Sequence, residues 1–445
     1  MPDTVIRGGM VITPDGPVAC DIAVDGGCFS AIGPELPGGA VEIDARGMTV
    51  MPGLIDVHVH FNEPGRTDWE GAATGSRALA AGGGTLFFDM PLNSTPCTVD
   101  AANFDSKAEA LAQSSLTDFA LWGGVIPRNH SALDELAERG VIGFKAFMCD
   151  SGLPEFPRAD DLTLFEAMLV AARHDLPLAV HAESEEITKA LAGRMREAGR
   201  HDIRAYLDSR PVLAELEAIQ RAAMLAKETG ARLHIVHISS GRGVALAAEL
   251  RAQGARITIE TCPHYLFFTE EDVERLGAVA KCAPPLRQEQ ERSQLWRQLK
   301  EGVIDIVASD HSPAPPELKQ DADFFQVWGG IAGGQSTLAV LLNGGLSMQL
   351  IAQVTAATPA RRFRIARKGF IAVGFDADFT IIDRRASFTL ETSDLFYRHK
   401  MSPYTGYTFQ GAVKRTVLRG RTIFENGSIH FNQPGQLIRP QERSC

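Results

Sequence analysis

Eight short apolar runs, each followed by a segment long enough for a helix, place the strongest constraint on the fold of this chain. They occupy residues 53–60, Thr85–Met90, Phe119–Val125, Val141–Phe147, Leu178–His181, Leu233–Ile238, Ile257–Thr261 and Ile304–Ser309. Because strand–helix repeats place parallel strands side by side, eight repeats over roughly 300 residues predict an α/β protein with a (β/α)8 TIM-like barrel. A doubly wound open sheet is the alternative, but no glycine-rich dinucleotide fingerprint follows the first strand.

One of the helical segments shows a clear apolar periodicity. It covers residues 160–174, and Asp160 is expected to cap its first turn. The apolar stripe consists of Leu162, Phe165, Leu169 and Ala172. A stripe with this spacing is typical of the face that a helix packs against a core.

Both ends of the chain have a different pattern, in which short β-like runs alternate with Gly and Pro. Examples are Ile22–Val24 near the N-terminus and Val413–Leu418 near the C-terminus. Because chain termini often lie close together, the two segments are expected to form one small β domain. The expected boundaries are 1–51 for its N-terminal part, 52–365 for the barrel, and 366–445 for its C-terminal part with an irregular tail from Gln433.

Composition narrows the classes of partner. The net charge of −11 argues against nucleic acid or an anionic membrane as a partner. No apolar run reaches membrane-spanning length, and the first residues lack the basic and apolar regions of a signal peptide, so a cytoplasmic location is expected. Seven scattered cysteines without a CxxC pair indicate reduced thiols.

Polar residues close several of the apolar runs. They are His58, His60, Lys145, His181, His237 and Asp310. Any one of them could be a hydrogen-bonded core residue, but all six fall at the strand ends where a barrel of this type carries its chemistry. Four imidazoles and a carboxylate form a nitrogen and oxygen ligand set that suits a metal such as Zn²⁺.

Lys145 is the unusual member of this set, because two divalent cations would repel an ammonium group. If CO2 adds to the amine, the resulting carbamate is anionic and offers one oxygen to each of two metals. The net charge left in such a site would suit an anionic tetrahedral intermediate. The alternative is a buried ion pair between Lys145 and Asp310 or Glu183.

Together these residues resemble the motif of the cyclic amidohydrolases, Asp56-x-His58-x-His60 followed by Lys145, His181, His237 and Asp310. The matching blocks HFNEPGRTDWEG (60–71), DMPLNS (89–94), GFKAFM (143–148), ETCPHYL (260–266), KCAPPLR (281–287), SDHSP (309–313) and WGGIAG (328–333) are most similar to those of the allantoinases. The resemblance implies a (β/α)8 barrel with a split β-sandwich and a hydrolase that opens the cyclic amide of allantoin to give allantoate. It also implies a homotetramer acting on a small molecule.

The same resemblance assigns roles to the six residues. His58, His60 and Asp310 are expected to bind one divalent metal, and His181 and His237 a second. Lys145, carboxylated on its side-chain nitrogen, is expected to bridge the two metals. Zn²⁺ is expected, with Co²⁺ or Mn²⁺ as possible substitutes. A hydroxide between the metals would be the nucleophile, and Asp310 would act first as general base and then as general acid.

Two positions separate this chain from neighbouring families. Dihydroorotases carry an Arg two residues after the second His to hold a substrate carboxylate, whereas this chain has Asn62. Dihydropyrimidinases and hydantoinases carry a Tyr five residues after the Lys, whereas this chain has Asp150. A hydantoinase or dihydropyrimidinase-type activity remains the alternative, and a metal-free scaffold protein is the alternative outside the enzymes.

The remaining candidates concern substrate binding. The expected contacts are the side chains of Asn62, Asn93 and Ser312 and the backbone near Ala283 and Gly333. His264 is expected to make a structural hydrogen bond, because the metal set is complete without it. His311 is expected to point away from the metals, since neighbouring residues of a strand face opposite sides.

Overall fold

A barrel of parallel strands forms the centre of the molecule in the computed structural model, which describes residues 1–431 and 433–441. Its strands are β6 (Leu54–Val59), β7 (Gly84–Asp89), β8 (Asp118–Leu121) with its continuation β9 (Gly123–Gly124), β10 (Phe144–Phe147), β11 (Pro177–His181), β12 (Arg232–Ile235), β13 (Arg256–Thr261) and β14 (Ile306–Val307). All pairs between neighbours are parallel. Each predicted apolar run therefore overlaps a barrel strand.

The barrel closes through two irregular joints. Between β8 and β9 only Trp122 interrupts the strand, and its indole donates a hydrogen bond to the carbonyl of Val57 at 3.0 Å. Between β6 and the segment after β14, Val59 pairs with His311, and the amide of His60 donates to the carbonyl of His311 at 2.8 Å. These contacts confirm the predicted (β/α)8 fold class.

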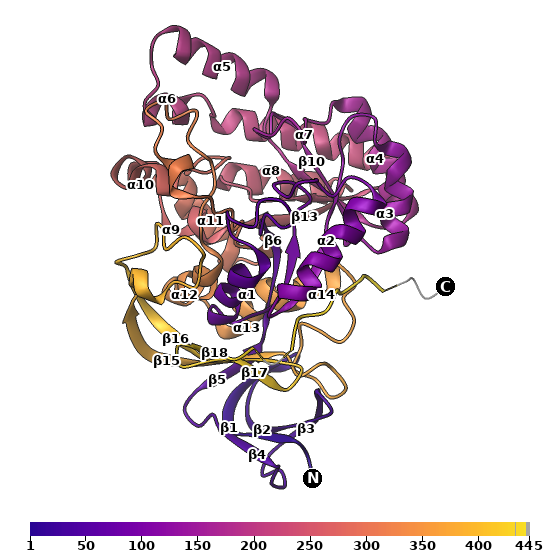
Figure 1. The fold of residues 1–445 in the computed structure, drawn as a ribbon, viewed down its shortest axis with the longest axis vertical. Helices are drawn as coiled ribbons and strands as arrows, with labels where there is room; N and C mark the ends of the chain where they lie inside the picture. Colours follow the sequence, from indigo (N-terminus) through magenta and orange to yellow (C-terminus); the bar gives the residue numbers. More distant parts are fainter. Residues whose placement is uncertain (432, 442–445) are drawn as a thin grey trace.

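Helices surround the barrel (Figure 1). The main ones are α1 (Ala72–Ala81), α2 (Ala101–Ser114), α3 (Leu133–Arg139), α4 (Asp161–Arg173), α7 (Val212–Thr229), α8 (Gly241–Ala252), α11 (Glu289–Lys300), α12 (Thr337–Asn343), α13 (Met348–Ala352) and α14 (Thr358–Arg362). Additional helices are inserted in the loops that follow the strands: α5 (Glu185–Glu197), α6 (Ile203–Asp208), α9 (Pro263–Phe267) and α10 (Glu270–Leu276). In Figure 1, α5 lies at the end of the molecule opposite the N-terminus.

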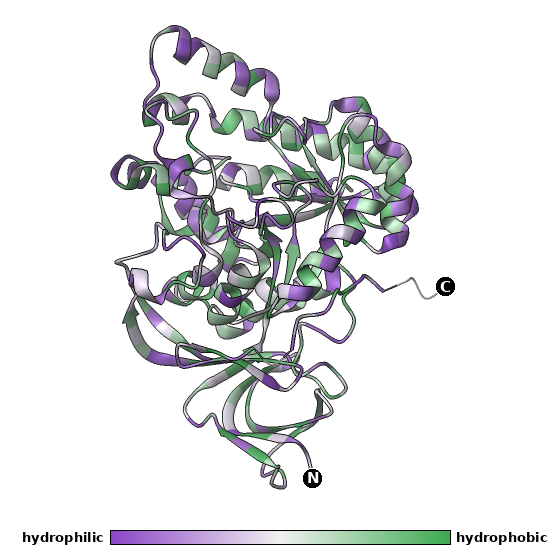
Figure 2. Cartoon of the chain, viewed as in Figure 1, coloured by the Kyte–Doolittle hydropathy of each residue, from purple (hydrophilic) through white to green (hydrophobic). Residues whose placement is uncertain are grey.

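The burial of the strands explains their sequence. Every residue of β6, β7 and β8 is buried, because the barrel interior covers one face and the helices cover the other. Figure 2 shows the hydrophobic strands inside and the more polar helix surfaces outside. Polar residues in such strands are therefore costly unless they are paired, and they concentrate at the strand ends.

The predicted apolar stripe of α4 is wrong, although the cap is correct. The Asp160 side chain accepts a hydrogen bond from the amide of Thr163 at 2.8 Å. The helix buries Leu164, Ala167, Met168 and Ala171, whereas Leu162, Phe165 and Leu169 are exposed. Because α4 carries apolar residues around most of its circumference, periodicity alone did not identify the buried face.

The two chain ends form one mixed sheet at the lower end of the molecule in Figure 1. Its strands are β1 (Thr4–Thr13), β2 (Gly16–Asp25), β3 (Cys28–Gly33), β4 (Val41–Asp44), β5 (Thr49–Pro52), β15 (Phe379–Thr389), β16 (Thr408–Leu418), β17 (Arg421–Glu425) and β18 (Ser428–Ile429). The antiparallel pair of β5 and β15 joins the N-terminal strands to the C-terminal strands. The predicted β domain from both ends is confirmed, and the boundaries after residues 51 and 365 stay predictions.

A buried charge cluster connects this sheet to the barrel. The Nζ atom of Lys368 lies 2.8 Å from Asp118 at the start of β8, 2.6 Å from Asp378 and 3.2 Å from Asp376. The three carboxylates raise the pKa of Lys368, although burial alone would lower it. Lys368 therefore remains an ammonium group and holds three buried carboxylates together.

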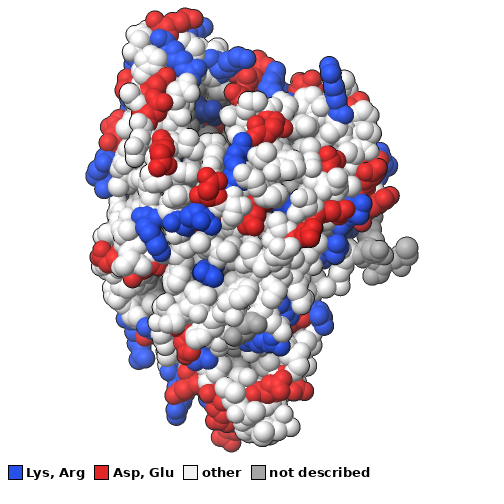
Figure 3. Space-filling view, viewed as in Figure 1, with Lys and Arg blue, Asp and Glu red and all other residues white. Residues whose placement is uncertain are grey.

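The surface has no pronounced charge segregation on the face seen in Figure 3, where acidic and basic side chains are interspersed. Within the described part of the chain, none of the helices has the length and apolar character needed to cross a membrane. The six cysteines of that part are unpaired, which agrees with the expected reduced thiols, and Cys445 lies outside it.

Candidate metal centre

The six predicted site residues converge at the carboxyl ends of the barrel strands. His58 lies in β6, Lys145 lies in β10, and His181 ends β11. His60 directly follows β6, whereas His237 lies two residues after β12 and Asp310 three residues after β14. All six side chains are buried. The Nε2 atoms of His58 and His60 lie 3.3 and 3.4 Å from Oδ1 of Asp310.

The two other imidazoles lie beside this group. The ring centroids of His181 and His237 are 4.6 Å apart, and those of His58 and His237 are 5.3 Å apart. Potential donor atoms of His58, His237 and Asp310 all lie within 4.8 Å of one another. The residues proposed for two metals therefore share one compact site.

The backbone is strained at two of these residues. His237 has a φ of 38° and Asp310 a φ of 45°, a region that non-glycine residues adopt uncommonly. Such conformations persist only where the surrounding structure enforces them, and they concentrate at functional sites. At both positions the strained residue directs a polar side chain toward the group at the centre of the barrel.

Burial sets the protonation state of the imidazoles. Burial lowers the pKa of His60, His181 and His237 below the ordinary value, so these rings are neutral at neutral pH. A neutral imidazole has a lone pair that can bind a metal ion. Burial raises the pKa of Asp310, but the nearby imidazoles of His58 and His60 outweigh this effect, so the carboxyl group is ionised.

Lys145 lies inside this group without a hydrogen-bond or ion-pair partner among the described residues. Its side chain is fully buried, and among the described residues its Nζ atom has no hydrogen-bond acceptor. The expected alternative, an ion pair with Asp310 or Glu183, is not formed. Burial lowers the pKa of Lys145 to about 8, which increases the fraction of neutral amine at neutral pH.

Two buried glutamates fix the orientation of the imidazoles, and sequence reasoning missed this role. Glu260, in β13, accepts hydrogen bonds from Nδ1 of His58 at 2.9 Å and from the amide of His237 at 3.0 Å. Glu183 accepts from Nε2 of His181 at 2.8 Å and pairs with Arg210 at 2.5 Å. With one ring nitrogen held in this way, the other nitrogen of His58 and of His181 is free to bind a metal.

The same contacts keep both glutamates ionised. Burial alone would raise the pKa of each carboxyl group. Attraction to His58 lowers the pKa of Glu260 to about 2, and attraction to Arg210 lowers the pKa of Glu183 to about 2. The only local signal for Glu183 was its position two residues after His181. Glu260 lies within a strand, and only the spatial arrangement of β6, β12 and β13 reveals its partners.

A cavity of about 700 Å³ opens above the site. Five of the six site residues line it, the exception being the fully buried Lys145. Asn93, Ala283 and Ser312 also line it, whereas Asn62 and Gly333 are not among the described residues of its wall. Residues of α5, including Thr188 and Arg196, also line it.

Asn62 and Gly333 instead contact neighbouring loops. The Nδ2 atom of Asn62 lies 3.4 Å from the carbonyl of Pro313, and its buried Oδ1 has no hydrogen-bond donor among the described residues. The amide of Gly333 donates to Nδ1 of His311 at 3.2 Å. Asp150 lines the cavity, and its carboxylate accepts a hydrogen bond from the amide of Gly152 at 3.0 Å.

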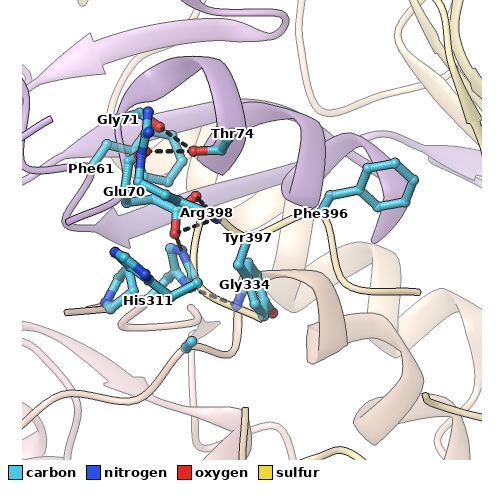
Figure 4. A network of polar contacts seen from close by, with 12 residues as sticks. Phe61, Glu70, Gly71, Thr74, His311, Gly334, Phe396, Tyr397 and Arg398 are labelled. Atoms are coloured by element: carbon cyan, nitrogen blue, oxygen red, sulfur yellow. Dashed lines mark hydrogen bonds and ion pairs between the residues drawn. The ribbon is translucent and has the colours of Figure 1, made fainter. Parts of the chain in front are cut away.

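The two remaining histidines differ from each other. His311 points away from the site and contacts Glu70 and Tyr397, as predicted (Figure 4). For His264 the predicted structural hydrogen bond is wrong, because in the described residues neither ring nitrogen has a partner. Potential ligand atoms of this buried imidazole, Cys262 and Asp310 lie within 4.8 Å of one another. His264 is therefore close to the site, but neither ring nitrogen has a hydrogen bond within the described residues.

The donor atoms fit a divalent metal centre. Neutral imidazoles and an ionised carboxylate supply the ligand types, and Nδ1 of His237 and Nζ of Lys145 are buried atoms without partners in the described structure. A buried polar atom without a partner is costly, and binding a metal would remove that cost for His237. Carboxylation would convert the Lys145 amine into a ligand.

The comparisons with known proteins agree with this geometry. The model of the amidohydrolase family matches residues 49–423. The allantoinases of Solibacter usitatus and Rubrobacter xylanophilus are 63% and 54% identical to this chain, and each alignment covers 99% of the chain and 98% of the relative. The solved structure of L-hydantoinase (dihydropyrimidinase) from Arthrobacter aurescens is 34% identical, with a TM-score of 0.96 over 99% of this chain and 100% of that one.

This chain therefore belongs to the amidohydrolase family, whose members are expected to hold a binuclear metal centre at this place in the barrel. Within the family it groups with the allantoinases, which match it over nearly its whole length. The dihydropyrimidinase from Brevibacillus agri has the same fold at 28% identity, with a TM-score of 0.92 over 99% of each chain.

Proposed function

We propose that this protein hydrolyses the cyclic amide bond of allantoin to give allantoate. The observation that carries the proposal is the buried Lys145 amine surrounded by four imidazoles and Asp310. This set is suited to metal-assisted hydrolysis of an amide, and the names of the relatives identify the amide. The cavity of about 700 Å³ has room for a small polar ring with a ureido arm.

Two divalent metal ions, most simply Zn²⁺, would be held by the six residues. His58, His60 and Asp310 would bind one ion, and His181 and His237 the other. When bound, the ions supply two effects, polarisation of the ring carbonyl and a lowered pKa of the attacking water. Co²⁺ or Mn²⁺ should be accepted as well, because nitrogen and oxygen ligands discriminate weakly among these ions.

Lys145 would bridge the two ions as a carbamate. The neutral Nζ atom forms a bond to the carbon of CO2, one C=O electron pair moves to oxygen, and the amine releases a proton. The lowered pKa of Lys145 favours this reaction because only the neutral amine is nucleophilic. The product is an anion with two oxygens, which replaces a buried amine that has no partner among the described residues.

Asp310 would move the proton. Its carboxylate lies at the centre of the site, 3.3 Å from His58 and 3.4 Å from His60, and lines the cavity. It accepts the proton of the attacking water and delivers it to the ring nitrogen as the C–N bond breaks. Asn93, Ser312 and the backbone at Ala283 line the cavity and would hydrogen-bond the substrate, while Asn62 and Gly333 stay predicted contacts.

A hydantoinase or dihydropyrimidinase activity is the second candidate, supported by the structural similarity to enzymes of that name. Substrate polarity separates the two candidates. Allantoin carries a neutral ureido arm, and a buried polar group left unpaired costs about 1–3 kcal/mol, so substrates without the arm should lose tenfold or more per missing partner. Dihydroorotate carries a carboxylate, and Asn62, which stays a predicted substrate contact, would be unable to neutralise it.

The test is to measure kcat/KM for allantoin, hydantoin, dihydrouracil and dihydroorotate with one metal loading. Allantoin should be the best substrate by at least tenfold, and Asn62→Arg should weaken its turnover. If dihydroorotate or a 5-substituted hydantoin is hydrolysed faster than allantoin, the assignment fails. The expected homotetramer and cytoplasmic location are also part of the proposal, and light scattering after size-exclusion chromatography tests the tetramer.

A further inference from the structure

Glu70 and His311 form a buried polar pair behind the proposed metal site (Figure 4). Glu70 is fully buried, and His311 is 1% exposed. The Nε2 atom of His311 lies 3.8 Å from Oε2 of Glu70. Neither residue is among the described residues that line the cavity, so the pair is separate from the substrate wall.

Hydrogen bonds from the backbone determine which ring nitrogen of His311 carries its proton. Nδ1 of His311 accepts from the amides of Gly333 at 3.2 Å and Gly334 at 3.3 Å. An amide is always a donor, so Nδ1 is the unprotonated nitrogen of the ring. The proton is therefore on Nε2, which lies 3.8 Å from the carboxylate of Glu70 and has no hydrogen-bond partner among the described residues, so the contact with Glu70 is electrostatic.

The backbone of His311 connects this pair to two proposed metal ligands. His311 directly follows Asp310, whose φ of 45° must be enforced by its surroundings. The carbonyl of His311 accepts a hydrogen bond from the amide of His60 at 2.8 Å. The amide of His311 donates to Oγ of Ser309 at 3.1 Å. A shift of His311 that moves its backbone would therefore displace both His60 and Asp310.

Glu70 is in turn held by a segment from the C-terminal part of the chain. The amide of Arg398 donates to Oε1 of Glu70 at 3.1 Å, and Nε of Arg398 donates to the backbone carbonyl of Glu70 at 2.7 Å. The ring of Tyr397 lies 4.8 Å from that of His311, centroid to centroid. Figure 4 shows Glu70, His311, Tyr397 and Arg398 converging from three separate parts of the sequence.

We propose that Glu70 is a positioning residue for the metal site of His58, His60 and Asp310, acting through the imidazole of His311. The segment that contains Tyr397 and Arg398 completes this support from the C-terminal part of the chain. The inference rests on the proposed function, because it takes His60 and Asp310 as metal ligands. The other two imidazoles, His181 and His237, have no contact with this network among the described residues.

The experiment measures metal binding, with no need for turnover. Parent, Glu70→Gln, His311→Asn and the double variant are stripped of metal and titrated with Co²⁺ against a competing chelator. The visible absorption spectrum reports the coordination geometry, and elemental analysis reports the number of metals. His311→Asn keeps an acceptor for Gly333 and Gly334 but removes the N–H that faces Glu70. Lys400→Ala, on the same segment but without a contact to Glu70, is the matched control.

Each single variant should bind one of the two metals about tenfold more weakly, the lower end of the range for groups that orient metal ligands. The double variant should be no weaker than Glu70→Gln, because both changes break the same interaction. Lys400→Ala should match the parent. The inference is overturned if Glu70→Gln keeps the parent affinity and spectrum, or if the two effects multiply in the double variant.

Misfolding of a variant and failure of the proposed function can both be distinguished from failure of this inference. If Glu70→Gln does not fold, the metal affinity of His311→Asn alone tests the inference. Parent-like metal affinity in that variant overturns it. If the parent itself binds fewer than two metals or does not hydrolyse allantoin, the proposed function fails whatever the variants do. A parent with two metals and allantoin turnover, together with unaffected variants, rejects only the role of Glu70.

Discussion

Replacing Glu260 by Gln is the most informative single change at the metal centre, because this carboxylate organises three donors. It accepts from Nδ1 of His58 at 2.9 Å, from Nε2 of His234 at 2.8 Å and from the amide of His237 at 3.0 Å. All four residues are buried. An amide of the same size has one acceptor oxygen and one donor nitrogen, so it cannot satisfy all three donors.

The geometry predicts which donor loses its partner. The backbone amide of His237 is a fixed donor, so the oxygen of the new Gln should stay near it and near Nδ1 of His58. The amide nitrogen then faces His234, whose ring can move its proton to Nδ1. That atom is buried and has no acceptor among the described residues, so one N–H group stays unpaired. The expected loss in the free energy of unfolding is about 1–3 kcal/mol.

This arrangement leaves His58 oriented, so Glu260→Gln should lower metal affinity only about tenfold. Urea unfolding of the metal-free protein measures the change in the free energy of unfolding. Titration of the metal against a competing chelator measures the change in metal affinity. Glu249→Gln, at an exposed position of α8, is the control and should match the parent. Unchanged stability, or a loss of metal affinity well beyond a hundredfold, would refute this account of the Glu260 hydrogen bonds.

Three further changes test the site and the fold. Exhaustive removal of metal should abolish turnover, and Zn²⁺, Co²⁺ or Mn²⁺ should restore it; full activity after confirmed metal loss would contradict the metal centre. Lys145→Ala should remain folded by circular dichroism but lose activity by at least about a hundredfold, with partial recovery in short carboxylic acids; parent-like activity would exclude the bridging role. Lys368→Met should lower the free energy of unfolding by about 3–5 kcal/mol in a denaturant titration, because it leaves Asp118, Asp376 and Asp378 without their shared cation. Because the pKa of Lys368 is raised in the folded state, its contribution to the free energy of unfolding should be present below about pH 10 and disappear at higher pH. Equal stability of Lys368→Met and the parent at pH 7 would contradict the stabilising role of Lys368.

The fold and the proposed metal ligands could be predicted because both leave local signals. An apolar run that ends in His181 or Asp310 identifies a strand and its functional end in one short segment. The sheet formed by both chain ends followed from a similar local change in pattern. Each of these inferences needed only neighbouring residues and one general rule for barrels.

The groups that support the ligands could not be predicted in the same way. Glu260 contacts His58, which lies about 200 residues away, and Glu70 contacts Arg398 more than 300 residues away. Glu260 lies in a predicted strand and Glu70 in a block that resembles the family, but the local sequence of neither glutamate identifies its partners. The exposed stripe of α4 and the unpaired His264 show the same limit, since only the packed structure determines which face is covered and which polar atom finds a partner.

The pairing of β5 with β15 has a consequence for synthesis of the chain on the ribosome. Strand β5 ends at Pro52, whereas its partner begins at Phe379, so roughly 330 residues are translated between them. At about 5–20 residues per second, the edge of β5 waits on the order of 15–65 s for its partner. During this interval the edge of β5 that faces β15 has unpaired backbone groups, and an unpaired strand edge can pair with other nascent chains.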